Sequence, residues 1–324
     1  MKQISIAIVI PYFGRFNNYF RLWLESAKNN PTIDFLLFTD QEVDSFNNIK
    51  VFKSSLQDVS NLAQRNLSEI LKEKGLPIIS GCGRINKPYK LCDYKPIYGI
   101  IFKQYLKNYD FWGHCDVDLI FGNIRHFITP EILYQYDRIL SCGHFSLYKN
   151  TYENNLKFLN SRGNLIGIPS YEQVYSSDKS FSFDEWPGMS KLWSTMNWSM
   201  YNTTIFDDIY VLRKHFISCQ KIEKDFGISN VIFAYDNGHL FRFYFRNSKV
   251  VKEETMYVHL QKRPMKVETN SIDKYLIVPN KFIDYQHPSA IVLRKYGNKW
   301  LFYPNAIKIR LNNLKRKIVD KFEH

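Results

Sequence analysis

The residues with the clearest chemical potential are two aspartates spaced one residue apart. Asp116 and Asp118 stand at the end of an apolar stretch that includes Phe111 and Trp112. Burying charge costs free energy unless the charge is paired or bound to a metal. Because residues i and i+2 of a strand point to the same side, we expect both carboxylates to bind one Mg²⁺ or Mn²⁺ ion, which keeps positions open for substrate phosphates. A surface turn with two solvated acids would have the same pattern.

A histidine far along the chain could add a nitrogen ligand. His259 lies near the end of residues 255–260, which are predicted to form a strand, and Lys262 and Arg263 follow it. An imidazole beside two carboxylates makes a mixed nitrogen and oxygen site, which favours Mn²⁺ over Mg²⁺. Lys262 and Arg263 could neutralise charge on a leaving diphosphate. The alternative is a strand-end histidine that is hydrogen-bonded into the core.

Two lysines and an aspartate lie just before a predicted helix. Pro96 suits the first turn of that helix, and Lys90, Asp93 and Lys95 precede it. Because helix N-termini favour anions, these side chains are candidates for binding phosphate or ribose. A helix start decorated with solvated lysines would look the same.

A third acidic site has aromatic neighbours. Asp184 and Glu185 lie between Phe183 and Trp186. Carboxylates can accept hydrogen bonds from sugar hydroxyls, and an indole ring can cover the apolar face of a sugar. One of the acids could also be a general base whose pKa is raised by apolar neighbours. An exposed helix start is the alternative. His144 follows another apolar run and could face the same cleft.

Alternating strands and helices are predicted to position these side chains. Residues 4–10 form an apolar run typical of a parallel strand covered on both faces. Further strands are predicted at 35–38 and 50–53, and helices at 20–27, capped by Asn17 or Asn18, and at 56–74, ended by Gly75. This alternation indicates an α/β fold with a mostly parallel central sheet flanked by helices. Ligands of such sheets bind at the carboxyl ends of the strands, where Tyr12, Asp40 and the central aspartates lie.

The later part of the chain predicts a hairpin and a basic tail. Residues 231–235 and 240–245 flank an Asn-Gly pair, which is a strong signal for a two-residue hairpin turn. Residues 305–324 place apolar side chains at helical spacing among lysines and arginines. This tail could be an amphipathic helix on an anionic membrane, or a terminal helix packed on the protein with a solvated basic face.

Composition restricts the class of protein. The 324 residues are 45% hydrophobic and 23% charged, which is ordinary for a globular protein, and we expect no signal peptide and no membrane span. Five scattered cysteines without a CxxC pair favour reduced thiols in the cytoplasm. The net charge of +13 calls for an anionic partner such as a nucleotide diphosphate or anionic lipid. No nucleic-acid-binding module is recognisable, so nucleic acid is not expected.

Several of these motifs, taken in order, resemble a known family. The order is Pro-Tyr after the first strand, Phe-Thr-Asp after the second, Lys-X-Cys-Asp-X-Lys-Pro before a helix, and then Cys-Asp-X-Asp-Leu-Ile-Phe-Gly. It resembles a bacterial family of GT-A-type glycosyltransferases associated with surface-polysaccharide synthesis. The resemblance spans residues 4–265 and includes the segments 183–186 and 257–263. Some GT-A enzymes carry a glycine between the late histidine and lysine, where this chain has Leu260 and Gln261.

The resemblance implies a fold and an activity. The fold would be GT-A-like (Rossmann-like): a single catalytic domain over 1–304, with a nucleotide-sugar-binding half at 1–125, an acceptor-binding half at 126–304, and the basic helix at 305–324. The enzyme would transfer a sugar from a nucleotide diphosphate donor, expected to be a UDP-sugar, to a glycan or lipid-linked acceptor. It would be cytoplasmic, with peripheral contact to the inner face of the membrane.

The resemblance also implies roles for the candidate residues. Asp116, Asp118 and His259 would hold Mn²⁺ or Mg²⁺, and Asp116 would also contact the donor. The remaining donor contacts would be Tyr12 and Asp40 near the nucleoside, Lys90, Asp93 and Lys95 near ribose or phosphate, and Lys262 on the diphosphate. Asp184 and Glu185 would act on the acceptor.

Three other functions remain compatible with the motifs. A haloacid-dehalogenase-type phosphatase also uses Asp-X-Asp after an apolar strand, although it places the motif early in the chain. A sugar nucleotidyltransferase shares the α/β pattern, but the N-terminal loop here has no Gly-rich phosphate cradle bearing Lys or Arg. A glycan-binding module or membrane-surface scaffold would keep the fold without turnover.

Overall fold

The computed structural model describes residues 3–163, 165, 167–211, 213–219, 227–261 and 263–297. The chain divides into two compact units, each built from separate stretches of sequence. The first comprises the described residues of Met1–Phe16, Asn30–Asp116 and Ile128–Thr203, and the second those of Asn17–Asn29, Val117–Phe127 and Thr204–His324. The predicted tail at 305–324 lies outside the described residues.

A mostly parallel sheet forms the centre of the first unit. Within the described part of this unit, seven strands pair in the order β3-β2-β1-β4-β7-β6-β8. The strands are β1 (Ile6–Tyr12), β2 (Ile33–Thr39), β3 (Ile49–Lys53), β4 (Phe111–Cys115), β6 (Arg138–Cys142), β7 (Phe145–Lys149) and β8 (Met200–Tyr201). Strands β1 to β4 pair in parallel, and β7 is antiparallel to both β4 and β6. The predicted α/β architecture is confirmed.

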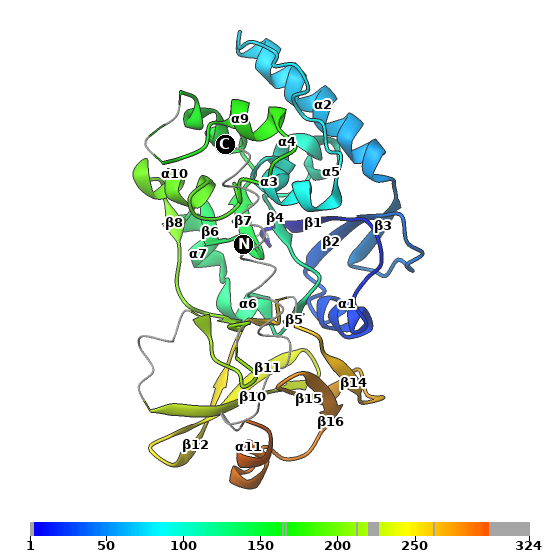
Figure 1. Ribbon diagram of the computed structural model, residues 1–324, viewed down its shortest axis with the longest axis vertical. Coiled ribbons are helices and arrows are strands. Elements are labelled where there is room, and N and C mark those ends of the chain that lie inside the picture. The colour runs from blue at the N-terminus through cyan, green and yellow to red at the C-terminus, as the bar shows by residue number, and fades with distance from the viewer. Residues whose placement is uncertain are drawn as a thin grey trace, which may run out of the picture. The chain divides into compact units, whose positions relative to one another are not determined.

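Short and long helices cover this sheet. They are α2 (Leu56–Glu73), α3 (Leu91–Tyr94), α4 (Tyr98–Ile101), α5 (Lys103–Leu106), α7 (Pro130–Gln135), α8 (Tyr152–Asn155), α9 (Tyr171–Ser176) and α10 (Met189–Thr195), with 3-10 turns at Pro88–Lys90, Lys95–Ile97 and Lys157–Ser161. In Figure 1, α2, α4 and α5 lie on one side of the strands. Their apolar faces, including Ala63 and Ile101, pack with Val9 and Leu36 of the sheet.

Two predictions about local structure in this unit need correction. The helix expected after Pro96 is instead a 3-10 turn followed by the four-residue α4. Helices this short have little macrodipole, so the argument for anion binding at a helix N-terminus does not apply. In addition, β1 continues through Tyr12, which was expected in a loop, because Tyr12 still pairs with Thr39 of β2.

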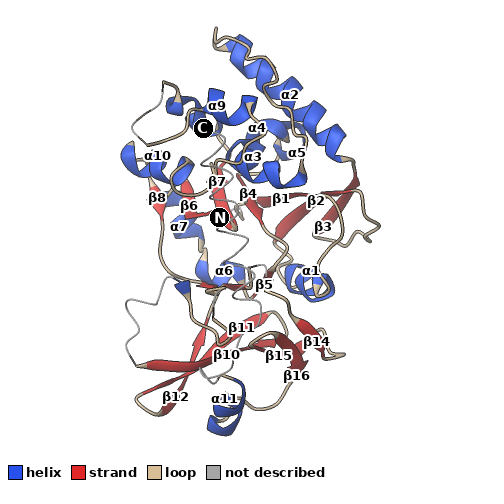
Figure 2. Cartoon of the chain, in the orientation of Figure 1, coloured by secondary structure: helices blue, strands red, loops and turns tan. Residues whose placement is uncertain are grey.

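The second unit contains two sheets and three helices within its described residues. Its elements are α1 (Phe20–Lys28), β5 (Leu119–Phe121), α6 (Ile124–Phe127), β9 (Asp207–Asp208), β10 (Ile228–Asp236), β11 (His239–Arg246), β12 (Lys249–Glu254), β13 (Tyr257–His259), β14 (Lys266–Glu268), β15 (Lys274–Val278), β16 (Lys281–Asp284) and α11 (Ala290–Tyr296). One sheet has the order β12-β11-β10-β15-β16-β14 and the other β5-β13-β9. Figure 2 shows the strands of both in red.

The predicted hairpin is confirmed in β10 and β11. Asp236 pairs with His239, so the turn consists of Asn237 and Gly238, both with positive φ (48° and 86°), as a type I′ turn requires. Helix α11 packs Val292 on one face of this sheet, with Ile232 among its neighbours in the same core.

Helix α1 forms where the apolar spacing predicted it, but its cap differs from the prediction. The N-cap is Tyr19, without a side-chain cap. The amides of Asn17 and Asn18 instead donate to the carbonyl oxygens of Val117 and Met265. These asparagines therefore tie the start of the helix to distant parts of the same unit.

Candidate functional site

The carboxyl ends of β2, β1 and β4 lie side by side in the first unit. Tyr12 pairs with Thr39, and the backbone N–H of Gly14 donates to Oδ1 of Asp40 at 3.1 Å. Asp116 directly follows the last residue of β4, which is the other parallel neighbour of β1. The sheet therefore brings three of the predicted residues to one edge, as expected for a ligand-binding edge of an α/β sheet.

Tyr12 and Asp40 differ in their surroundings. The ring of Tyr12 stacks on Phe16, with centroids 4.7 Å apart, so it forms part of an aromatic surface. Asp40 is exposed, and hydrogen bonds from the side chain of Gln41 and the backbone of Gly14 lower the pKa of its carboxyl group. Asp40 is thus an ionised acceptor beside an aromatic pair.

Lys95 connects two of the candidate acids. Its ammonium group donates to Oδ1 of Asp116 and to the carbonyl oxygen of Gly143, both at 2.7 Å, and lies 3.4 Å from Oδ2 of Asp184. Burial disfavours the charge of Lys95, but the neighbouring acids, Asp116 foremost, outweigh burial and raise its pKa well above the ordinary value. Lys95 is therefore a fixed cation that positions carboxylates, where the sequence predicted a phosphate contact.

Asp184 is the buried member of the predicted acidic pair. Burial raises the pKa of Asp184 to about 7, with Lys95 acting in the opposite direction and Glu185 in the same one. Glu185 is exposed, and Trp186 is 63% exposed. A side chain at Gly143 would overlap both acids, since a Cβ there would lie 2.6 Å from Oε1 of Glu185 and 2.7 Å from Oδ2 of Asp184. The backbone of Gly143 therefore lies close against both carboxyl groups.

Lys90 and Asp93 hold the segment that carries Asp184. Both are buried, and Nζ of Lys90 donates to Asp93 at 2.9 Å, to the carbonyl oxygen of Val174 at 2.8 Å and to that of Lys179 at 2.5 Å. These acceptors match the three donors of an ammonium group. Asp93 accepts the backbone N–H groups of Phe181 and Phe183. Lys90 and Asp93, which were predicted to contact ribose or phosphate, therefore anchor the backbone of residues 181–183 just before Asp184.

The Asp-X-Asp motif lies in a connection between strands, and the prediction that it continues a strand is wrong. Strand β4 ends at Cys115 and β5 begins at Leu119, so alternation along a strand does not align the two acids. The chain passes from the first unit to the second between Asp116 and Val117. The covalent backbone alone keeps the Cα atoms of Asp116 and Asp118 within about 7 Å of each other.

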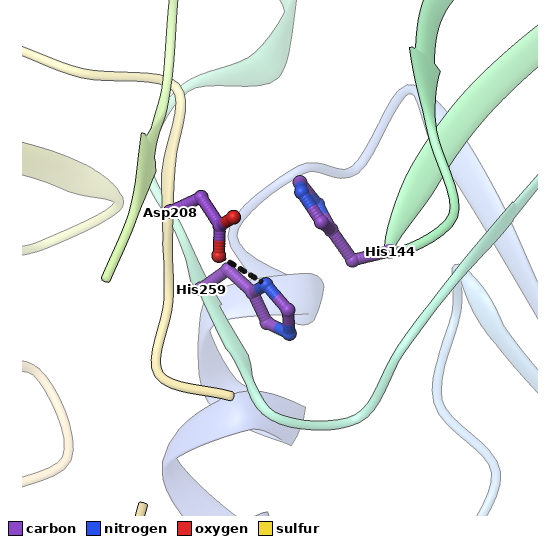
Figure 3. Close-up of side chains that lie close together, drawn as sticks. All are labelled: His144, Asp208 and His259. Carbon is purple, nitrogen blue, oxygen red and sulfur yellow. Dashed lines mark hydrogen bonds and ion pairs between the residues drawn. The ribbon is translucent and has the colours of Figure 1, made fainter. Parts of the chain in front are cut away.

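His259 lies between two aspartates in the second unit. Its Nδ1 is 2.7 Å from Oδ1 of Asp208, and its Nε2 is 3.3 Å from Oδ1 of Asp118. Figure 3 shows the bond between Asp208 and His259. Burial disfavours the imidazolium, but the charges and hydrogen bonding of both aspartates outweigh it and raise the pKa of His259 to about 10. Asp118 and His259, which were predicted to share one metal site, therefore lie close together.

Strand pairing explains why these three side chains meet. His259 belongs to β13, the central strand of the three-stranded sheet, and its register partners are Leu119 of β5 and Asp208 of β9. Asp118 immediately precedes Leu119, and its carbonyl oxygen accepts the backbone N–H of Leu260 at 3.0 Å. The two neighbouring strands thus deliver one carboxylate to each side of the imidazole.

Sequence reasoning missed Asp208. Strand β9 has only two residues, Asp207 and Asp208, so no periodic pattern indicated it. The available signal was an acidic pair between Phe206 and Ile209, which are both buried. Asp207 itself is buried and pairs with Arg242, whose Nε lies 3.5 Å from Oδ1. Consecutive residues of a strand point to opposite faces, which separates the two acids.

The loop after His259 holds a residue other than glycine in a backbone conformation that favours glycine. Gln261 has a φ of 51°, in the left-handed region, and its side-chain amide donates to Oδ1 of Asp208 at 2.8 Å. Lys262, predicted to contact the diphosphate, lies outside the described residues. Arg263 is buried and donates to Tyr210, Arg213, Lys214 and Asn280. Its guanidinium group thus holds the backbone carbonyl groups of Tyr210, Arg213 and Lys214.

Taken together, these features define a mixed α/β protein with acids, a buried lysine and aromatic rings around the carboxyl edge of a mostly parallel sheet. The chain belongs to a family of unknown function, DUF6625, which it matches over residues 8–286. No curated protein matches the chain. Within the residues that the structure describes, no helix has both the length and the apolar character needed to cross a membrane.

Proposed function

We propose that this protein is a metal-dependent glycosyltransferase with a GT-A-like fold. It transfers a sugar from a nucleotide diphosphate donor, a UDP-sugar by our expectation, to a glycan or lipid-linked acceptor. The observation that carries the proposal is the pair formed by Asp118 and His259. Oδ1 of Asp118 is a buried atom that faces Nε2 of His259 at 3.3 Å, a separation across which the two could share one ion.

The donor set fits a divalent cation. A carboxylate oxygen and an imidazole nitrogen that face each other can share an ion, and this mixed set favours Mn²⁺ over Mg²⁺. Asp116 is the third ligand of the proposal, because it precedes Asp118 by two residues and Lys95 fixes its carboxylate. A bound cation would supply charge neutralisation for the diphosphate and for the leaving group.

The carboxyl edge of the first sheet supports the binding of the donor. The stacked pair of Tyr12 and Phe16 offers a surface for a flat base, and the ionised Asp40 can accept hydrogen bonds from a nucleoside. The net charge of +13 favours an anionic ligand. Lys90, Asp93 and Lys95 support this site by positioning other groups.

Asp184 is the best candidate for the acceptor base. A general base works best when its pKa lies near the working pH, and the pKa of Asp184 is raised to about 7. The anchored segment before it and the exposed Trp186 beside it suit a sugar: the carboxylate would take the hydroxyl proton while the indole covers the ring. Glu185 is exposed and would contribute a hydrogen bond to the acceptor.

The cellular setting belongs to the same proposal. An enzyme that uses nucleotide sugars and keeps five cysteines free of the patterns of secreted disulfide proteins suits the cytoplasm. The predicted tail at 305–324 would add peripheral contact with an anionic membrane if its basic face is turned to lipid.

Hydrolysis and transfer assays with a panel of nucleotide sugars and Mn²⁺ test the proposal. Wild-type protein should release nucleoside diphosphate from one of them, and EDTA or Asp118→Asn should abolish this release. Asp284→Asn, which removes an exposed carboxylate at the end of β16, is the control. Release of inorganic phosphate from phosphate monoesters would indicate a phosphatase, and formation of a nucleotide sugar from a nucleoside triphosphate a nucleotidyltransferase. Binding of glycan without turnover would indicate a scaffold.

A further inference from the structure

Asp208 contacts the imidazole of His259 on the side opposite Asp118. We infer that Asp208 is a positioning residue, which fixes the tautomer and the ring orientation of His259 so that Nε2 is presented to a divalent cation shared with Asp118. This inference rests on the metal role in the proposed function and adds a residue that the sequence motifs do not include.

The geometry of the second unit supports this assignment directly. Oδ1 of Asp208 is 2.7 Å from Nδ1 of His259, which is a short, charge-assisted hydrogen bond. The pairing of β9 with β13 sets His259 opposite Asp208, so the contact is built into the sheet. Both side chains are largely buried, with 11% and 16% of their surface exposed, so water competes little for this bond.

Other residues hold Asp208 itself. The amide of Gln261 donates to the same Oδ1 atom at 2.8 Å from a backbone in the left-handed region. On the other face of β9, Asp207 is paired with Arg242 in the interior. Asp208 is therefore fixed both through its own carboxylate and through its strand.

The chemistry of histidine explains what this contact achieves. A metal ion binds imidazole only after displacing the proton on the ligating nitrogen, so its binding to His259 would release the proton from Nε2. A carboxylate that accepts the remaining N–H at Nδ1 keeps that proton there and leaves the lone pair on Nε2. A carboxylate in this position also increases the basicity of the ligating nitrogen, and loss of such a partner weakens metal affinity by about tenfold to a hundredfold. Without Asp208, the ring of His259 can rotate or adopt the other tautomer.

Titration calorimetry with Mn²⁺ alone, combined with pulsed EPR of the bound ion, tests the inference on the full chain. Wild-type protein should bind Mn²⁺ and show coupling to an imidazole nitrogen, and His259→Ala should lose the coupling. Asp208→Ala should raise the dissociation constant by about tenfold to a hundredfold and weaken the nitrogen coupling. Asp208→Asn keeps an oxygen acceptor for Nδ1–H, so it should keep the coupling and lose less than about tenfold in affinity. Asp284→Asn, with the same change of charge, should bind as wild type does.

The outcomes separate this inference from the proposed function. If wild-type protein takes up no Mn²⁺, both are overturned. If wild type binds Mn²⁺ with nitrogen coupling while Asp208→Ala keeps the same affinity and coupling, the role of Asp208 is overturned and the proposed function stands. Circular dichroism checks folding. Should Asp208→Ala not fold, Asp208→Leu takes its place under the same criteria, because leucine keeps the bulk of the side chain and offers no hydrogen-bond acceptor for Nδ1–H.

Discussion

The candidate side chains of this protein fall into two groups. Those of the first group would contact a ligand in the proposed function, and those of the second group hold the first in position. Asp118 and Asp184 belong to the first group, and Lys90 and Asp93 to the second. The difference could not be predicted from residue type, since a lysine near an expected helix start has the same signature in both roles. Burial separates them: Lys90 has internal acceptors for all its donors.

The first residue-scale prediction concerns His259. His259→Ala should weaken Mn²⁺ binding by about tenfold or more, because the imidazole contributes the nitrogen ligand. Isothermal titration of the full-length variant with Mn²⁺ measures this. His239→Ala, which removes a half-exposed histidine paired with Glu254, is the matched control. Equal Mn²⁺ affinity in the two variants would return His259 to a purely structural role.

The second prediction separates acceptor chemistry from donor binding. Asp184→Asn should reduce sugar transfer by about a hundredfold or more, because a neutral amide cannot take the proton. Its affinity for the nucleotide sugar should stay near wild type. Glu185→Gln should mainly raise the KM for the acceptor, since its exposed side chain positions the sugar. Steady-state kinetics with both substrates varied distinguishes these effects, and wild-type kinetics in both variants would exclude this segment from catalysis.

The third prediction is the pH dependence that follows from Asp184. Since a base must be deprotonated, kcat/KM should rise with pH and level off above about 7, and Asp184→Asn should lack this limb. The sign for stability is opposite. The folded pKa lies above the ordinary value of 3.8 for an aspartate, so this carboxyl group stabilises the fold at pH below about 4 and loses that contribution as pH rises through about 7. Chemical denaturation of wild type and Asp184→Asn across this range checks it.

At the scale of elements, strands and helices with a clear periodic pattern of apolar residues could be predicted from the sequence. Elements too short to show such a pattern could not. The strands β1 to β3, the helix α2 and the hairpin of β10 and β11 were predicted from apolar runs, helix ends and an Asn-Gly turn. Strand β9, with two residues, has no period to detect, and Asp208 was missed with it. The Asp-X-Asp motif was assigned to a strand because apolar residues surround it, whereas Cys115 ends β4 and a turn follows.

Buried pairing between elements yields a prediction about stability. Asp93→Ala removes the partner of the buried Lys90 and the acceptor for two backbone N–H groups, so it should destabilise the fold by about 3 kcal/mol or more. Thermal unfolding followed by circular dichroism measures the change. Glu69→Ala breaks the exposed pair with Lys103 and should leave the melting temperature nearly unchanged. A similar small shift for both variants would contradict the anchoring role of Asp93.

At the scale of the whole molecule, the chain passes more than once between the two compact units. Each unit is assembled from separate stretches, so neither corresponds to a single piece of sequence. In the second unit, Leu22 of α1 and Ile120 of β5 share one core with Phe233 and Val258 from much later in the chain. A core of this kind depends on contacts between residues far apart in sequence.

This interleaving predicts the behaviour of a fragment. A polypeptide of residues 204–297 lacks α1 and β5, so β13 loses its antiparallel partner and the core loses Tyr19, Leu22 and Ile120. The fragment should show no cooperative thermal transition and poor dispersion of its amide NMR signals, whereas the full chain should melt cooperatively. A fragment that melts cooperatively at the temperature of the full chain would show that the early segments are dispensable for this unit.

The buried pair of Arg242 and Asp207 has a consequence for folding fidelity. If β9 shifted by one residue along β13, Asp207 would lie opposite His259. An aspartate would still face the imidazole, so the contacts of His259 alone would not disfavour the wrong register. Phe206 would then occupy the interior position, and the buried guanidinium group of Arg242 would lose its ion pair with Asp207, which costs free energy. The ion pair of Arg242 with Asp207 therefore favours the native register of β9, in which Asp208 and not Asp207 contacts His259.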